Sequence, residues 1–575
     1  MQAIAEQLEE ILQKRYHRWK NAELPAYLSK ELNELKASDI IDRFYQDLPL
    51  EEGGVRGATG VGTNRMNIYT IRRVCRGLAE EIRSRGFAAQ QRGIAIGYDS
   101  HPFSRGLAEQ AALVLANNEV KCYLFSRPSP GGELAFAVRY LHAAGGLHMT
   151  GGEDFSGCIL YDEQGWPAPR ETSSRLSRYM AQWEDGLSIQ TMDAEAATGK
   201  GRLVFAGGEI EQAYLKEMER VAMSSESNQI IGSSVRILQL QEDREEFHPL
   251  RSALRRSGFT AVHSLPEGSQ AGGIPAGHFA EQFDWRSAYA AAGTFNADLI
   301  VAFDPQLSRM ALSIKADGGR YMRLSPGETA ALALNYVLRQ KKLRGESPAG
   351  GALLKSLFSG ELAAAVARKA GLRIIHAGSG GGKAAAGELV HADAAGGLIG
   401  YDEDGGFTLG APSAASDAIP YALLAAEMSA YYKSVGRTLH AELLSLYEEY
   451  GWYAEDRVEL NFRGLEGRQR VSLLMGRLAK DFLRVLGGIK VERLFDFRAG
   501  ELIHLAKGKH LPLEQGRADA LKFVLEDGSW YGLRAGSAWP GLQLFFGTYA
   551  ADRQESRRKL AALRSDVLFM LENML

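Results

Sequence analysis

Two short polar segments of this 575-residue chain have side chains that could bind ions. The segment Asp304-Pro-Gln-Leu-Ser-Arg309 offers one carboxylate, one amide and one hydroxyl on alternating positions. Hard cations such as Mg²⁺ need clusters of oxygen ligands, so this set would hold a metal only weakly. The segment Arg534-Ala-Gly-Ser537 offers a guanidinium and a hydroxyl. Anion capture depends on such groups being arranged together with backbone N–H groups.

Longer segments of the chain resemble a known family. Gly53-Gly-Val-Arg-Gly57 and Gly60-Val-Gly-Thr-Asn-Arg-Met-Asn67 are similar to two opening motifs of the α-D-phosphohexomutases, the phosphoglucomutase and phosphomannomutase family. Gly97-Tyr-Asp-Ser100 follows at the right spacing. Phe136-Ala-Val-Arg139 and Ala144-Gly-Gly146 then lead toward the family's phosphoserine loop. The resemblance extends from about residue 15 to residue 575.

The resemblance places Gly152 where the family has its nucleophile. The family's T-A-S-H-N-P supplies a serine that carries the phosphoryl group, whereas the matching segment here is Thr150-Gly-Gly-Glu-Asp-Phe155 and is shorter. Thr150 and Ser156 match other family positions, which favours a structural role for both, and Cys158 is the remaining nearby substitute. The acidic residues after Gly152 would repel an arriving phosphate. We therefore predict no catalytic residue.

The same resemblance implies a decayed metal site. The family pattern D-P-D-x-D-R holds Mg²⁺ with three aspartates, whereas here Asp304 remains and Gln306 and Ser308 replace the other two. We expect Asp304 to be a remnant of a metal site and expect no functional Mg²⁺ cofactor. We also expect Arg309 to lack the anionic neighbours that it has in the family.

The family's sugar and phosphate loops keep some of their residues. Asp402 and Glu403 match carboxylates that accept hydrogen bonds from sugar hydroxyls, and Asp404 stands in place of a serine. A plain solvated turn has the same composition, Arg534 could equally be a surface ion-pair partner, and Arg56 could be kept for the fold alone. The candidate substrate-binding residues that the resemblance implies are Asp402, Glu403, Arg534, Ser537 and Arg56.

Composition is that of a compact, water-soluble protein. Charged residues make up 24% of the chain and the formal net charge is −3, so there is no excess of cations to neutralise a nucleic-acid backbone. The three cysteines have no metal-binding or redox spacing, which suits a reducing compartment. No apolar run is long enough to span a membrane, and the start does not read as a signal peptide. We expect a cytoplasmic protein with neither nucleic-acid nor membrane partners.

The hydrophobic pattern predicts a layered α/β architecture in several domains. Short apolar runs at 93–98, 121–125, 235–240 and 299–303 read as strands, 106–116 and 248–258 read as helices, and a third unit begins near 329–338. Segments 427–433 and 446–453 resemble the helix pair after the family's sugar loop, and strands are predicted at 520–525, 529–534 and 542–546. The resemblance implies three similar mixed α/β domains and a smaller C-terminal α+β domain around a central cleft, at 1–205, 206–325, 326–454 and 455–575.

These residues favour one function and leave a second open. The first is a catalytically inactive pseudoenzyme of carbohydrate metabolism, which binds a sugar or sugar phosphate or regulates a protein partner. The alternative is an active hexose-phosphate mutase, an intramolecular phosphotransferase. The detection of a phosphorylated residue after exposure to a hexose bisphosphate would separate the two.

Overall fold

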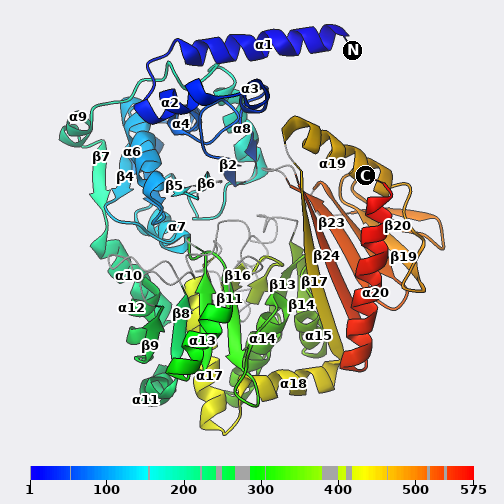
Figure 1. The fold of residues 1–575 in the computed structure, drawn as a ribbon. Helices are drawn as coiled ribbons and strands as arrows, with labels where there is room; N and C mark the ends of the chain where they lie inside the picture. The colour runs from blue at the N-terminus through cyan, green and yellow to red at the C-terminus, as the bar shows by residue number, and fades with distance from the viewer. Residues whose placement is uncertain are drawn as a thin grey trace.

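The computed structural model describes residues 2–574 apart from several segments. Those outside it are 52, 153–155, 221–222, 224, 241–248, 266–284, 305, 378–398, 410–416, 463, 514–517 and 537–540. The candidate Ser537 therefore lies outside the described residues. Within the described residues the strands form four sheets, which follow one another around an arc in Figure 1. The mixed α/β architecture in several domains that was predicted from the sequence is confirmed.

The first sheet has the strand order β1-β2-β6-β5-β3-β4-β7. Its strand β3 is buried at every position, as expected for a parallel strand with helices on both faces. Helix α4 begins after Asn67, whose side chain accepts hydrogen bonds from the backbone N–H groups of Tyr69 and Thr70. The strands are β1 (Leu50–Glu51), β2 (Gly54–Gly57), β3 (Ile94–Tyr98), β4 (Cys122–Phe125), β5 (Gly145–Thr150), β6 (Ser156–Tyr161) and β7 (Leu203–Ala206). The helices are α1 (Gln2–Lys20), α2 (Ala26–Glu34), α3 (Ala37–Phe44), α4 (Ile68–Ser84), α5 (Phe87–Arg92), α6 (Pro102–Asn117), α7 (Gly131–Tyr140), α8 (Arg170–Met180) and α9 (Ala194–Gly199).

The second and third sheets share one hydrophobic core. Helix α17 is buried on almost all sides and lies between them, which makes the core continuous from Tyr214 to Tyr447. The second sheet region comprises α10 (Gly208–Glu219), α11 (Ser225–Ile231), η1 (Gly232–Ser234), β8 (Ile237–Leu240), α12 (Pro249–Arg256), β9 (Val262–Ser264), α13 (Trp285–Phe295), β10 (Leu299–Phe303), β11 (Met310–Lys315) and β12 (Tyr321–Arg323). The third comprises α14 (Pro326–Leu343), β13 (Ala352–Ser356), α15 (Leu362–Lys369), β14 (Arg373–Ala377), β15 (Ile399–Tyr401), β16 (Phe407–Leu409), α17 (Ala418–Ser434) and α18 (Leu439–Tyr450).

Each of these three sheets turns from parallel to antiparallel pairing at one hairpin. In the first sheet β3 and β5 are parallel, and β5 pairs antiparallel with β6. The same change occurs at β10 and β11 and at β15 and β16. The connections within these hairpins carry Gly152, Asp304 and Asp402. The three candidate loops therefore occupy equivalent positions in three similar sheets.

The fourth sheet is antiparallel and has two differently covered faces. Leu544 and Phe546 of β24 pack with helices α19 and α20, whereas the alternate residue Phe545 packs with Phe358 of the third sheet region. The sheet has the order β17-β24-β23-β22-β19-β20-β21. Its elements are β17 (Trp452–Asn461), α19 (Gly464–Leu478), β18 (Val485–Leu486), β19 (Ile489–Asp496), β20 (Glu501–His504), β21 (Lys509–Pro512), β22 (Ala520–Leu525), β23 (Trp530–Ala535), β24 (Gly541–Ala550) and α20 (Arg553–Glu572).

One predicted helix was too long. The segment 446–453 was expected to be helical throughout, but α18 ends at Tyr450 and Trp452 begins β17. Gly451 between them has φ +89, a left-handed conformation that ends a helix and that glycine adopts most readily. The expected division at 455 thus falls inside β17, and the expected division at 205 falls inside β7. The division into domains stays a prediction.

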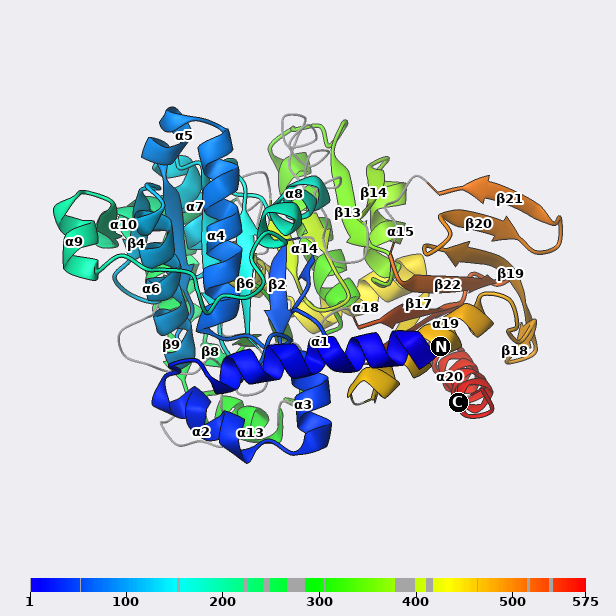
Figure 2. The same ribbon diagram turned by 90° about the horizontal axis from the view of Figure 1, so that it is seen from above.

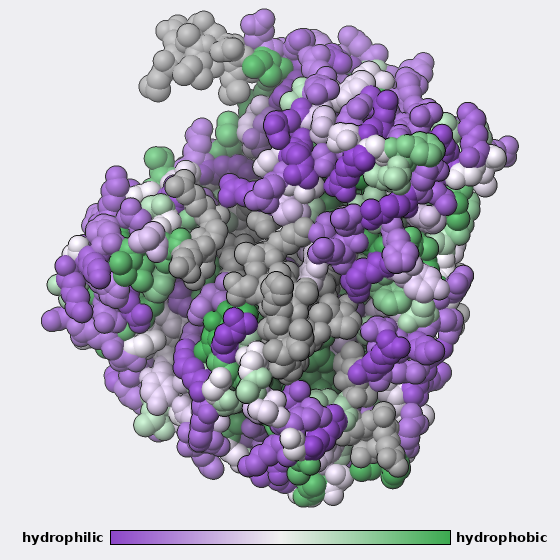
Figure 3. All heavy atoms as spheres, turned by 180° about the vertical axis from the view of Figure 1, so that it is seen from behind, coloured by the Kyte–Doolittle hydropathy of each residue, from purple (hydrophilic) through white to green (hydrophobic). Residues whose placement is uncertain are grey.

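The N-terminal helix lies along the outside of the molecule, as Figure 2 shows from above. In the view of Figure 3 hydrophilic side chains cover most of the described surface, with apolar residues scattered among them. None of the described helices combines the length and the apolar character needed to cross a bilayer.

Candidate functional site

The loop after β5 has no reactive side chain at the position of Gly152. Nearby Thr150 is buried, and Ser156 shares a hydrogen bond of 2.8 Å with Thr59, between their hydroxyl oxygens. Cys158 is also buried, which raises the pKa of its thiol to about 12 and keeps it protonated. Each of these three possible substitutes for the nucleophile is therefore a buried residue of the sheet. Glu153 and Asp154, whose charges were expected to repel phosphate, lie outside the described residues.

Asp99 closes the base of this loop from the end of β3. One carboxylate oxygen accepts the N–H of Gly151 at 2.9 Å, and the other accepts the hydroxyl of Ser104 at 2.6 Å and the N–H of His101 at 3.1 Å. Burial has the larger effect and raises the pKa of Asp99 to about 7, while the hydrogen bonds from these three donors offset part of that rise. A Cβ on Gly151 would lie 2.3 Å from Nδ1 of His101, so this position accepts only glycine without rearrangement. Asp99 therefore fixes the path of the loop.

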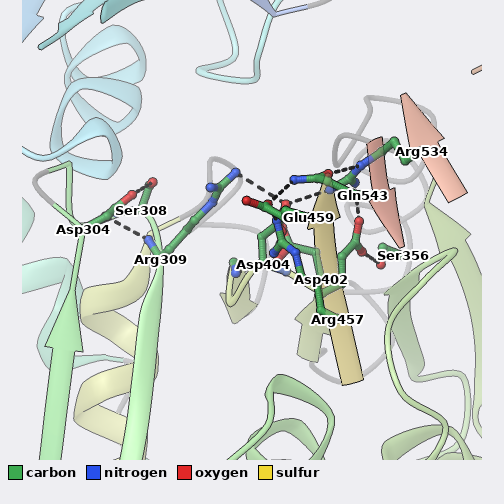
Figure 4. Close-up of polar contacts among 12 residues, drawn as sticks. Asp304, Ser308, Arg309, Ser356, Asp402, Asp404, Arg457, Glu459, Arg534 and Gln543 are labelled. Atoms are coloured by element: carbon green, nitrogen blue, oxygen red, sulfur yellow. Dashed lines mark hydrogen bonds and ion pairs between the residues drawn. The ribbon is translucent and has the colours of Figure 1, made fainter. Parts of the chain in front are cut away.

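Asp304 uses both of its carboxylate oxygens within its own loop (Figure 4). Oδ1 accepts the N–H groups of Ser308 at 2.8 Å and Arg309 at 3.1 Å, and Oδ2 accepts the hydroxyl of Ser308 at 2.6 Å. Burial also raises the pKa of Asp304 above its usual range. No group of three or more His, Cys, Asp or Glu side chains that could hold a metal occurs among the described residues. Asp304 thus directs both carboxylate oxygens to donors of its own loop.

Arg309 has anionic neighbours, contrary to the sequence-based expectation. A terminal nitrogen of its guanidinium lies 3.8 Å from Oδ2 of Asp404, and the N–H of Met310 donates to the carbonyl of Gly405 at 2.9 Å. Burial alone would lower the pKa of Arg309, but Asp404, Asp402 and Asp304 raise it. The expectation was wrong because the turn after β15, far along the chain, supplies the missing charges. The second and third sheet regions are thus joined at this point.

Asp402 holds the acidic turn in shape. Its Oδ1 accepts the N–H groups of Asp404 at 2.9 Å and Gly406 at 2.7 Å. Gly405 between them has φ +81, so the tight reversal depends on a glycine there. Burial, and then the charge of Asp404, raise the pKa of Asp402 to about 7. Asp402 therefore acts first as a structural residue of the turn.

Glu403 and Asp404 both form ion pairs with Arg534. The guanidinium of Arg534 donates to Oε1 of Glu403, to Oδ2 of Asp404 at 3.1 Å and to Oε1 of Gln543 at 2.9 Å. The hydroxyl of Ser356 donates to the second oxygen of Glu403. Burial alone would lower the pKa of Arg534, but the two carboxylates raise it. Two candidate substrate-binding residues, Glu403 and Arg534, are thus partners of each other.

A second arginine in this cluster was missed in the sequence. Arg457 of β17 donates to Oδ1 of Asp404 at 2.5 Å and to Oε1 of Glu459 at 2.5 Å, and Gln543 donates to the same Glu459 oxygen at 2.8 Å. Arg457 and Glu459 are two residues apart, a spacing that places side chains on one face of a strand. That spacing was the one signal in the sequence, and it indicates a shared strand face without identifying Asp404 or Gln543 as partners.

Arg56 lies apart from Arg534, on β2 beside Gly157 and near Arg309. Its side chain is exposed to solvent, and Cγ would lie 2.9 Å from a Cβ placed on Gly157. The surrounding protein displaces part of the hydration of the Arg56 guanidinium although the side chain reaches solvent, and this effect, followed by the charge of Arg309, lowers the pKa of Arg56. Arg56 and Arg309 therefore form a basic pair beside the loop of Asp304.

Known protein sequences are similar to this chain along most of its length. Residues 49–186 match the family profile described as phosphoglucomutase/phosphomannomutase, alpha/beta/alpha domain I. A phosphoglucomutase of Staphylococcus aureus strain N315 is 24% identical over 569 residues, covering 94% of this chain and 99% of that protein. A phosphoglucomutase of Staphylococcus saprophyticus is 24% identical over 507 residues, covering 86% of this chain and 89% of that protein.

Solved structures show that the fold is shared. A putative phosphomannomutase from Thermus thermophilus superposes with a TM-score of 0.63 at 18% identity, over 92% of this chain and 100% of that chain. The open form of parafusin, a phosphoglucomutase from Paramecium, gives a TM-score of 0.61 at 12% identity, over 92% and 97%. The chain therefore shares its multi-domain α/β fold with these two proteins. Residues 49–186 thus match domain I of the phosphoglucomutase/phosphomannomutase family, and the chain is similar to phosphoglucomutases along most of its length.

Proposed function

We propose that this chain is a phosphohexomutase-family protein without mutase activity, which recognises a sugar or sugar phosphate or docks onto a protein partner. The proposal rests on the hydrogen bonds of Asp304, whose two carboxylate oxygens both accept from Ser308 or Arg309 of the same loop. A phosphoryl acceptor needs a nucleophile and a cation to screen its charge. Gly152 supplies no nucleophile, and the loop of Asp304 is satisfied without a cation.

Sugar recognition is supported by the acceptors that remain on the acidic turn. A carboxylate has roughly four lone-pair sites, and Asp402 uses two of them for the N–H groups of Asp404 and Gly406. The remaining sites can accept hydroxyl groups of a sugar without unmaking the turn. Arg56 is exposed and could meet an attached anionic group. The proposed ligand is therefore a sugar, with or without a phosphate.

We also propose a reducing, cytoplasmic location. Cys75, Cys122 and Cys158 are all free and buried. A protein of an oxidising compartment more often pairs its cysteines in disulfides. The three buried thiols support a cell interior where thiols stay reduced.

An active hexose-phosphate mutase is the alternative. It is favoured by one observation, the similarity to phosphoglucomutases over nearly their whole length. At 24% identity such a relative shares the scaffold, whereas activity depends on a few residues of the site. The two proposals differ in whether the chain accepts a phosphoryl group.

The deciding experiment exposes the purified full chain to glucose 1,6-bisphosphate with Mg²⁺ and searches for a phosphorylated residue by intact mass and peptide mapping. We expect no adduct, and no conversion of glucose 1-phosphate to glucose 6-phosphate in a coupled dehydrogenase assay. A phosphoglucomutase from Staphylococcus aureus assayed in parallel is the positive control. Turnover of about 1 s⁻¹, the low end of ordinary enzyme rates, would establish the mutase alternative.

Ligand recognition is tested separately by calorimetry with glucose, glucose 1-phosphate and mannose 1-phosphate on the unmutated chain. We expect a saturable heat of binding with at least one of these three sugars. If a sugar phosphate binds with its phosphate on Arg56, the Arg56→Ala variant should bind that ligand more weakly. Absence of heat with all three would refute sugar recognition and leave protein docking as the function to test.

A further inference from the structure

Three arginines from different parts of the chain converge on one carboxylate. Arg457 of β17 and Arg534 of β23 contact Asp404 at 2.5 Å and 3.1 Å, and Arg309 beside β11 lies 3.8 Å away. Figure 4 shows the three side chains pointing toward the turn that carries Asp404. Such a set of guanidinium groups is the usual arrangement for binding an oxyanion such as phosphate. Here the oxyanion is a side chain of the protein itself.

Neighbouring side chains hold Arg457 and Arg534 in place without a bound ligand. The guanidinium carbons of Arg457 and Arg534 lie 5.4 Å and 5.1 Å from the centre of the Phe545 ring. Gln543 bridges Arg534 to Glu459, which in turn accepts from Arg457. Cation–π contact and these hydrogen bonds hold the two planar groups in place. The site is therefore preorganised.

The conformation of the turn directs the Asp404 side chain toward the arginines. Its backbone N–H is bound by Asp402, and Gly405 follows with φ +81. Although burial alone would raise it, the charges of Arg534, Arg457 and Arg309 lower the pKa of Asp404 below its usual range. Only 15% of the Asp404 side chain and 17% of the Arg457 and Arg534 side chains are exposed, so water and salt screen these ion pairs weakly.

We propose that Asp404 is a built-in anionic ligand, which fills an oxyanion site made by Arg309, Arg457 and Arg534 and thereby keeps phosphate-class dianions out. The three arginines are balanced by Glu403, Asp404 and Glu459, so an incoming dianion must displace a carboxylate. The contact also joins the turn after β15 to the C-terminal sheet. The same carboxylate thus blocks the site and holds the third and fourth sheet regions together.

The test compares inorganic phosphate binding by the full chain and by Asp404→Ala, measured as a melting shift and by calorimetry. Removal of the carboxylate leaves three partly buried cations with an uncompensated charge, so the variant should melt at a lower temperature in chloride and recover as phosphate is added. We expect the variant to bind phosphate at least about tenfold more tightly than the unmutated chain, a change of about 1.4 kcal/mol. Sodium chloride at equal ionic strength is the control for screening.

Two further variants keep the test decisive. Asp404→Asn preserves the shape of the turn and removes only the charge, so it should also gain phosphate binding even if the alanine variant fails to fold. Asp527→Ala removes a carboxylate of the fourth sheet region that is 22% exposed and pairs at 2.7 Å with Lys559, outside the cluster, and should gain nothing. Equal phosphate affinity in the unmutated chain, Asp404→Ala and Asp404→Asn would overturn the proposal. No phosphoryl transfer enters these measurements, so their outcome is independent of mutase activity.

Discussion

Phe358 stacks on Phe545 with ring centroids 4.8 Å apart and an angle of 6° between the planes. Phe358 follows β13 of the third sheet region, whereas Phe545 lies on β24 of the fourth. Next to this pair, Lys522 donates to the carbonyl of Leu357 at 2.6 Å. The C-terminal sheet therefore contacts the third sheet region through a buried aromatic pair as well as through the arginine cluster.

Replacement of Phe358 by alanine should lower the free energy of unfolding by about 3–5 kcal/mol, the usual cost of removing a buried phenylalanine. The residue is 3% exposed, and its loss leaves a cavity beneath Phe545. Urea unfolding followed by circular dichroism measures the change. The matched control is Phe569→Ala, because Phe569 on α20 is 66% exposed and should cost little. A Phe358→Ala variant as stable as the Phe569→Ala control would show that the Phe358–Phe545 contact does not stabilise the fold.

Millimolar Mg²⁺ should leave the melting temperature of the unmutated chain unchanged. A site filled at about a hundred times its dissociation constant would stabilise the fold by roughly 2.7 kcal/mol, which heating detects easily. Asp304→Ala should be less stable by about 2–3 kcal/mol with or without Mg²⁺, because the N–H groups of Ser308 and Arg309 lose their acceptor. Asp304→Asn retains an acceptor oxygen and should cost less. A saturable Mg²⁺ shift that Asp304→Ala abolishes would show that the loop does bind the ion.

Asp99 should make the protein less stable as the pH rises toward neutrality. The folded protein holds this proton up to a pKa of about 7, whereas the unfolded chain releases it near 3.8. Between these values the folded state binds more protons, so the free energy of unfolding falls with rising pH and levels off above about 7. Relative to Asp99→Asn, the unmutated chain should lose on the order of 2 kcal/mol between pH 5 and pH 8. Parallel pH profiles for both proteins would disprove the raised pKa.

Buried strands were the easiest elements to predict from the sequence. The strand predicted at 299–303 has the same bounds in the structure, because all five of its residues are apolar and buried. The parallel strand β3 differs from its prediction only at its first residue, which is a glycine with φ +71. Continuous apolar runs of this length have few alternatives in a layered fold.

The arginine cluster could not be predicted, because its members meet only through the folded topology. Arg457 and Gln543 come together since β17 pairs with β24 and places Glu459 opposite Gln543. Arg309 meets Asp404 because Arg309 pairs with Gly406 across two sheet regions. Sequence spacing carries no information about such long-range registers. The resemblance to the family named Arg534 and Glu403 as separate ligand contacts, whereas the structure pairs them with each other.

Restoring the nucleophile alone should not restore activity, so Gly152→Ser should remain inert in the coupled mutase assay. The new hydroxyl would follow Gly151, whose N–H is bound to Asp99, but the loop of Asp304 would still hold its own hydrogen bonds in place of a cation. Arg534 would still be occupied by Glu403 and Asp404. Groups that act as a unit recover almost nothing when one of several missing members returns. The assay should run beside Gly152→Ala, which matches the backbone change without the hydroxyl. Turnover of glucose 1-phosphate, or a stable phosphoserine after treatment with glucose 1,6-bisphosphate, in Gly152→Ser but not in Gly152→Ala would show that a single substitution separates this chain from an active mutase.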